Sequence, residues 1–187
     1  MGKRIASFAA VLILIAMPAI ALAGYATSLR YATKTGRVYH TVTWDLKLIW
    51  RATFSSDSFR EAFIKRHAVV NHLTPEETAV FTAEQERRQQ DGWEFFIGMY
   101  TKDPYKNFSA YEDSFWQILL ETESGEVYKP LSVDMIPITP YEGVMYPYLD
   151  RWSRAYRVVF PKVPLGSKIR LMLQSVIGQS TLKWNIE

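Results

Sequence analysis

Residues 38–54, Val38-Tyr-His-Thr-Val-Thr-Trp-Asp-Leu-Lys-Leu-Ile-Trp-Arg-Ala-Thr-Phe54, alternate between two kinds of side chain. The even-numbered positions are mostly apolar and the odd-numbered positions are mostly polar. Only a β-strand places successive side chains on opposite faces, so the pattern predicts one apolar face of an antiparallel sheet. Because a strand rises about 3.3 Å per residue, this one would be unusually long, and we expect a bend, a bulge or a switch between two sheets within it.

The periodicity becomes helical after this stretch. Ser58-Phe-Arg-Glu61 has the spacing of a capping box, and Thr74-Pro-Glu-Glu77 repeats it with proline at the first helical position. Asp91-Gly92 is a stop signal for the second helix. Residues 58–91 are therefore predicted to form a helical hairpin.

Strand signals then continue to the end of the chain. Residues 93–101 are apolar at both parities, as expected for a central strand. The segments 115–123 and 127–135 flank Ser124-Gly125, which predicts a hairpin turn. Further strands are predicted at residues 156–160, 168–175 and 179–186.

Strands at this spacing, without a repeating strand–helix–strand order, predict a mainly β, α+β protein: an antiparallel two-layer β-sandwich with one helical insertion at about 58–91. The architecture resembles immunoglobulin-like sandwiches in general terms, although the cysteine and tryptophan hallmarks of true immunoglobulin domains are absent. We expect one domain over residues 24–187, because no repeat or linker indicates a second.

The first 23 residues have the three parts of a secretory signal peptide. Lys3 and Arg4 form a basic start, an apolar stretch follows, and the small residues Ala21 and Ala23 precede a predicted cleavage site at Gly24. The alternative is an uncleaved anchor, because the apolar run continues to residue 26 and could just span a bilayer. We expect an exported protein, periplasmic or secreted, that is associated with a membrane only if the leader is retained.

The composition of the exported part limits the classes of partner and of chemistry that we expect for it. The net charge of +3 includes Lys3 and Arg4; without them 20 basic and 19 acidic residues remain, a charge of +1. A general attraction to nucleic acid therefore has no basis. The chain has no cysteine, which excludes disulfides, thiolate chemistry and a lipid-modified cysteine.

Neither a metal site nor a catalytic motif stands out. His67 and His72 are five residues apart and would not share a helix face, and His40 is expected to be a core or sheet-end residue. No nucleophile elbow and no glycine-rich phosphate loop occurs. We expect no metal and no cofactor. Carboxylate pairs occur at Glu76–Glu77, explained by capping, at Glu84–Glu86, explained by a solvated helix, and at Glu112–Asp113. The last pair lies in a predicted loop and is the candidate for glycoside hydrolysis or calcium binding.

Two predicted loops, 103–116 and 139–156, are rich in aromatic residues. Exposed tyrosines and tryptophans can stack on sugar rings or anchor a protein partner, but long loops more often bury them. If residues 148–156 are helical, Arg151, Arg154 and Arg157 form a positive stripe. The candidate binding residues are Tyr105, Tyr111, Trp116, Tyr141, Tyr146, Tyr148, Arg151, Trp152 and Arg154.

We therefore expect an exported, non-catalytic binding protein of the cell envelope or medium, whose two aromatic loops contact a protein partner or a glycan. The first alternative is a carbohydrate-active or hydrolytic enzyme that uses the loop carboxylates. The second is a membrane-tethered accessory subunit of an envelope complex, which requires the leader to remain attached.

Overall fold

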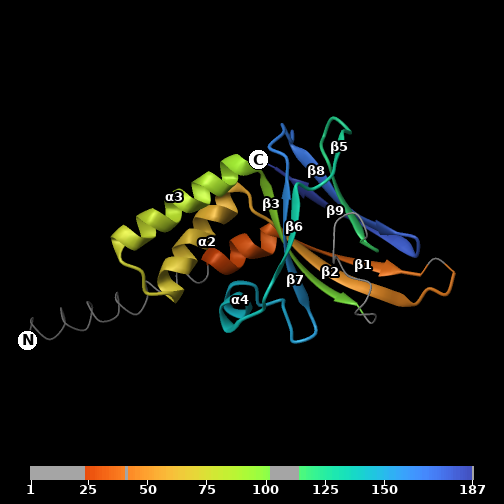
Figure 1. Ribbon diagram of the computed structural model, residues 1–187, viewed down its shortest axis with the longest axis horizontal. Coiled ribbons are helices and arrows are strands. Elements are labelled where there is room, and N and C mark those ends of the chain that lie inside the picture. Colours follow the sequence, from red (N-terminus) through yellow and green to blue (C-terminus); the bar gives the residue numbers. More distant parts are fainter. Residues whose placement is uncertain (1–23, 41, 102–113, 187) are drawn as a thin grey trace, which may run out of the picture.

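The protein is a mixed α+β fold with two antiparallel sheets, seen in a computed structural model that describes residues 24–40, 42–101 and 114–186 (Figure 1). The strands are β1 (Thr33–Tyr39), β2 (Leu46–Phe54), β3 (Trp93–Thr101), β4 (Gln117–Glu121), β5 (Val127–Tyr128), β6 (Ser132–Ile136), β7 (Arg154–Phe160), β8 (Lys168–Ser175) and β9 (Gly178–Asn185). The helices are the segment 24–32, α2 (Asp57–Val70), α3 (Pro75–Asp91) and α4 (Pro140–Met145).

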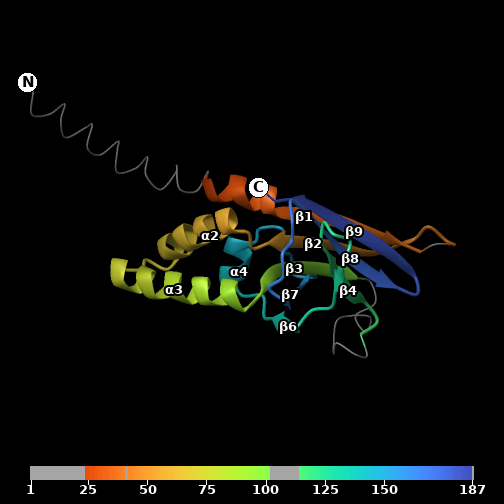
Figure 2. The same cartoon turned by 90° about the horizontal axis from the view of Figure 1, so that it is seen from above.

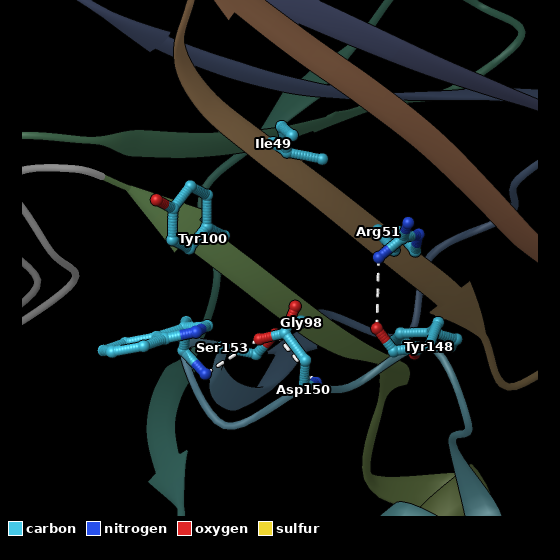
Figure 3. Close-up of a pocket in the computed structure, with 8 residues that line it drawn as sticks. Ile49, Arg51, Gly98, Tyr100, Tyr148, Asp150 and Ser153 are labelled. Atoms are coloured by element: carbon cyan, nitrogen blue, oxygen red, sulfur yellow. Dashed lines mark hydrogen bonds between the residues drawn. The ribbon is translucent and has the colours of Figure 1, made fainter.

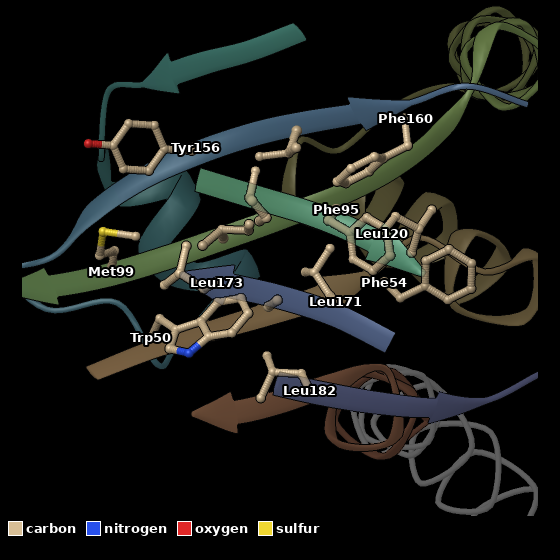
Figure 4. Close-up of a cluster of buried hydrophobic side chains, with 14 of the residues drawn as sticks. Trp50, Phe54, Phe95, Met99, Leu120, Tyr156, Phe160, Leu171, Leu173 and Leu182 are labelled. Atoms are coloured by element: carbon tan, nitrogen blue, oxygen red, sulfur yellow. The ribbon is translucent and has the colours of Figure 1, made fainter. Parts of the chain in front are cut away.

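One sheet has five strands in the order β1-β2-β3-β7-β6, and the other has four in the order β5-β4-β8-β9. Apolar side chains from both sheets meet in one buried cluster, which includes Trp50, Phe95, Leu120, Leu171 and Leu182 (Figure 4). The indole Nε1 of Trp50 donates to Ser180 Oγ at 3.1 Å, which joins β2 to β9 inside this core. The shared core holds the two sheets together by burying one face of each.

The helices gather at one end of the molecule, and the hairpin turns of the sheets project at the other (Figures 1 and 2). A second buried cluster joins the helical segment 24–32, α2 and α4 to the outer face of the five-stranded sheet, through residues such as Leu29, Phe59, Phe96 and Met145. No helix in the described part of the chain combines the length and the apolar character needed to cross a bilayer. The helices thus cover only one part of the outer face of this sheet and leave the other part without a helix on it.

The stretch 38–54 forms two strands, not the single bent strand that its alternation predicts. A turn at Val42 and Thr43 separates β1 from β2, which pair as an antiparallel hairpin. His40 closes this turn: its Nδ1 accepts the backbone N–H of Val42 at 3.3 Å and of Thr43 at 3.2 Å. His40 is thus a sheet-end residue, not a core residue. The turn contains no glycine or proline, so the sequence carries no signal for it.

The helical hairpin is confirmed, but the first cap lies elsewhere. Ser56, not Ser58, caps α2, because its backbone is extended and its Oγ accepts the N–H of Phe59. Thr74 and Glu77 form the predicted capping box of α3, with both reciprocal hydrogen bonds present. The buried guanidinium of Arg60 joins the two helices by donating to the backbone and side-chain oxygens of Gln85.

The remaining strand predictions are confirmed for β3, β7 and the pair β8–β9, and are wrong in part for residues 127–135. That stretch divides into β5, in the four-stranded sheet, and β6, in the five-stranded sheet. Pro130 lies at the break, where its missing N–H cannot take part in a ladder. Residues 154–160 are also a strand, so Arg154 and Arg157 lie on opposite faces and the predicted positive stripe does not form.

Candidate functional site

A pocket of about 250 Å³ lies where the outer face of the five-stranded sheet is free of helices (Figure 3). Its floor comes from two pairs of cross-strand neighbours on β2 and β3, which the register places side by side: Ile49 with Tyr100, and Arg51 with Gly98. The loop that follows α4 supplies the rest of the wall through Tyr148, Asp150, Trp152 and Ser153.

The loop is held on the sheet by stacking at its start. The ring of Tyr146 stacks on that of Phe96, with centroids 3.7 Å apart and planes 4° apart. Tyr146 is only 7% exposed and belongs to the second buried cluster. Because Phe96 lies on β3 two residues before Gly98, this stack fixes where the loop crosses the sheet.

Hydrogen bonds hold the next part of the loop. The hydroxyl of Tyr148 is 2.8 Å from Thr53 Oγ1, which is itself 2.7 Å from Thr33 Oγ1. The carbonyl oxygen of Tyr148 accepts from Arg51 Nη1 at 3.1 Å. Burial raises the pKa of the Tyr148 hydroxyl, so this group stays protonated and can donate at neutral pH.

Gly98 allows this close approach. A Cβ at this position would lie 2.6 Å from Leu149 Cδ2 and 3.0 Å from Tyr148 Cε2, both closer than normal contacts. A side chain here would therefore displace the loop or force its side chains into other rotamers. Glycine in the middle of a central strand is explained by this contact and not by the strand itself.

The far end of the loop is a tight turn around Asp150. Its Oδ1 accepts the backbone N–H of Trp152 at 2.8 Å and the hydroxyl of Ser153 at 3.0 Å. The turn directs Trp152 outward, where the residue is 65% exposed and Arg151 lies over its ring at 4.8 Å. A large aromatic face is thus presented to solvent by a rigid turn at the pocket.

The pocket combines a cation with hydrogen-bonding groups and aromatic rings. Arg51 is half-buried, and no carboxylate among the described residues lies within ion-pair distance of it. Its Nη1 donates to the Tyr148 carbonyl, and the guanidinium has further N–H donors besides this one. The serine and the carboxylate in the wall bond to each other within the turn, an arrangement that accounts for both without catalysis.

The predicted binding residues are only partly brought together. Tyr148 and Trp152 line the pocket, and Arg151 lies beside it on the exposed loop. Trp116 is 1% exposed within the core between the sheets, so its ring is not available to a partner. Tyr141 is half-buried, with its hydroxyl 2.6 Å from His67 Nδ1. Tyr105, Tyr111, Glu112 and Asp113 lie outside the described residues.

Sequence reasoning missed Arg51, Gly98, Tyr100, Asp150 and Ser153. Two signals were present: Gly98 interrupts an otherwise apolar central strand, and Arg51 occupies the polar parity of β2. Neither shows which loop covers the strands.

No metal-binding cluster is present in the part of the chain that the structure describes, since no three His, Asp or Glu side chains gather there. His67 stacks on Phe81 with centroids 3.7 Å apart, and burial lowers its pKa. This histidine serves the packing of the helices.

No family model, no curated protein and no solved structure matches this chain. The pocket is therefore the feature from which a function can be inferred.

Proposed function

We propose that this chain is an exported, non-catalytic binding protein whose pocket holds an acidic sugar ring of a glycan. The observation that carries the proposal is the pairing of a half-buried guanidinium, Arg51, with an exposed aromatic ring, Trp152, in the same preformed pocket. An arginine fork binds a carboxylate through two parallel hydrogen bonds, and a flat aromatic ring packs against the apolar face of a sugar.

The size of the pocket limits the ligand. Pockets for drug-sized ligands measure about 300–1,000 Å³, so 250 Å³ corresponds to one ring or one side chain of a larger molecule. The chemistry of the walls selects further. A ligand with a carboxylate toward Arg51 and hydroxyl donors toward Asp150 satisfies both charges, whereas a simple anion would meet the carboxylate of Asp150 with nothing to donate. A sugar acid has both kinds of group.

Export is the part of the proposal that rests on sequence. The basic start, the apolar stretch and the Ala21–Ala23 cleavage pattern support it. Cell fractionation followed by intact-mass measurement tests it: a product beginning at Gly24 outside the cytoplasm supports release, and a cytoplasmic full-length chain would refute export.

We also propose how the two sheets are arranged: they stack face to face as the two layers of a sandwich. The common core supports the two-layer sandwich predicted above, with immunoglobulin-like architecture only in the general sense. At one edge of the sandwich, Gly36 on β1 lies close to Ser180 on β9, so these two strands, one from each sheet, are neighbours there.

Titration with single sugars tests the binding site. Wild-type protein is titrated with glucuronate, galacturonate and uncharged glucose, followed by calorimetry. We expect the two acids to bind more tightly than glucose. Arg51→Met should weaken acid binding by about tenfold or more, because hydrogen bonds to charged groups contribute about 1.5–3 kcal/mol. Trp152→Ala should weaken all binding, since the ring serves any sugar.

Matched variants separate binding from folding. Arg51→Lys keeps the charge without the fork and should lie between wild type and Arg51→Met. Val80→Ala, on an exposed position of α3, should leave binding unchanged. Equal binding of glucose and the acids, or identical titrations for wild type and Arg51→Met with folded protein, would refute the assignment of an acidic ligand.

A further inference from the structure

Two hairpin turns project from the end of the molecule that lies opposite the helices (Figures 1 and 2). The turn between β1 and β2 exposes Val42 by 79% and Trp44 by 77%, and the turn between β8 and β9 exposes Val176 by 91%. The two turns lie next to each other, because a Cβ at Gly178 would lie 2.7 Å from the carbonyl oxygen of Tyr39. We call Tyr39, Val42, Trp44 and Val176 the tip surface.

Trp44 has an unfavourable backbone conformation. Its φ is +57°, in the left-handed region that bulky side chains rarely adopt. The ring is exposed, so the fold gains little packing from it in return. The turn thus holds a large apolar ring in solvent at the cost of an unfavourable backbone conformation, which motivates a search for a contact outside the chain.

Several backbone N–H groups around the tip surface are hydrogen-bonded within the turns. The N–H groups of Val42 and Thr43 donate to His40 Nδ1, that of Trp44 donates to the His40 carbonyl at 2.9 Å, and that of His40 donates to the Asp45 carbonyl at 2.9 Å. In the other turn, the N–H of Ile177 donates to Ser175 Oγ at 3.2 Å. Internal pairing is a requirement for backbone that leaves water for an apolar medium.

Charge is scarce in the two turns themselves. No charged residue occurs between Arg170 and Lys183, so the whole β8–β9 turn is neutral. In the other turn Asp45 pairs with Lys47 at 3.6 Å, which leaves Arg37 as the nearest unpaired charge along that hairpin among the residues described. Insertion into an apolar medium would therefore bury no isolated charge from the turns themselves.

We infer that the tip surface inserts shallowly into a lipid bilayer. A bilayer accommodates a convex, strongly projecting surface, whereas a protein partner would need a matching hollow for each turn. Tryptophan and tyrosine prefer the membrane–water interface, where an apolar ring and a polar tip are both satisfied. This inference is independent of the pocket, which lies on the outer face of the five-stranded sheet.

Attraction to anionic lipid should contribute little. The described residues next to the two turns, Arg37, Asp45 and Lys47, carry one net positive charge. At about 1 kcal/mol per basic residue, anionic lipid should strengthen binding through them by about fivefold at most. Binding should accordingly persist at high salt, as expected for an apolar contact.

Site-specific labelling of the full chain tests the inference, and the absence of native cysteine makes it direct. Val42→Cys, Val176→Cys and the control Val80→Cys are each labelled with an environment-sensitive fluorophore and mixed with phosphatidylcholine vesicles. Labels at 42 and 176 should shift to shorter emission wavelength and be quenched by spin-labelled lipid, and the label at 80 should do neither. This readout holds even if the leader binds vesicles by itself, because it reports the label position.

A second variant separates insertion from folding. Asparagine tolerates the left-handed conformation, so Trp44→Asn should keep or raise the melting temperature. When Trp44→Asn is combined with labelled Val176→Cys, the ratio of inserted to free label should fall at least about tenfold. The reason is that a large apolar side chain no longer contributes its area to burial in the bilayer. Labels at 42 and 176 that remain in water while vesicles are present, or insertion unaffected by Trp44→Asn, would overturn the inference.

Discussion

Replacing Tyr146 by alanine should destabilise the protein strongly, whereas the same change at Trp152 should not. The two aromatic residues are six positions apart in one loop, and the structure gives them opposite roles. Tyr146 is buried, stacks on Phe96 and lies within 6.2 Å of the ring of Phe63. Trp152 is exposed, and Arg151 lies over its ring.

The loss of stability expected for each variant follows from how deeply its ring is buried. Truncating a buried aromatic ring to alanine costs about 3–5 kcal/mol through lost transfer energy and the cavity that remains. For a protein of this length, 1 kcal/mol corresponds to about 2–4 °C, so Tyr146→Ala should lower the melting temperature by about 6–20 °C. Trp152→Ala should change the stability by no more than about 0.5 kcal/mol.

Thermal and urea unfolding followed by circular dichroism measure both effects. Tyr146→Phe is the matched control, because it keeps the stacked ring and should remain within about 1.5 kcal/mol of wild type. A double-mutant cycle with Phe96→Ala should give a coupling of about 0.5–1.5 kcal/mol. A neutral Tyr146→Ala variant, or a Trp152→Ala variant that is equally destabilised, would refute the assignment of the one ring to the core and the other to the surface.

Three further changes test the sheet, the pocket and the helices. Gly92→Ala would place a Cβ against the Phe160 carbonyl, whose strand cannot move, and should cost about 1–3 kcal/mol in urea unfolding, while Gly143→Ala, with open space around it, should not destabilise. Gly98→Ala meets the side chains of Leu149 and Tyr148, which can shift together with their loop. Its unfolding free energy should therefore change by less than about 1.5 kcal/mol while sugar binding falls; unchanged binding would contradict the role of the loop. His67 has a folded-state pKa below its usual value because of burial, so its contribution to stability is present above about pH 6.5 and is lost as the pH falls through the folded pKa. Melting temperatures from pH 7.5 to 5 should fall less steeply for His67→Gln than for wild type, and an equal or steeper fall would contradict this linkage.

Local signals predicted several elements well. The apolar residues at both parities of 93–101 identified β3 as a central strand, because such a strand is covered on both faces. The capping box at Thr74 placed the start of α3, since its hydrogen bonds join residues only three apart. The last hairpin, β8 with β9, also followed from local alternation and a turn glycine.

Other features could not be predicted from local sequence patterns. The alternation through residues 38–54 continues across a turn, so it does not distinguish one strand from two; the closing group is a histidine, which carries no turn signal. For the aromatic loops, composition could not separate Trp116 in the core from Trp152 on the surface, because both residues occur in similar surroundings along the chain.

The sequence by itself determined the helical hairpin, most of the strands, the cap of one helix, and that disulfides play no part. The tertiary structure decided the pocket. Arg51 meets Gly98 only through the register of β2 with β3, and the loop from Tyr146 reaches them only through its stack on Phe96, 50 positions away. Secondary structure depends on neighbours three or four residues apart, whereas a site of this kind depends on packing between distant segments, which no local pattern encodes.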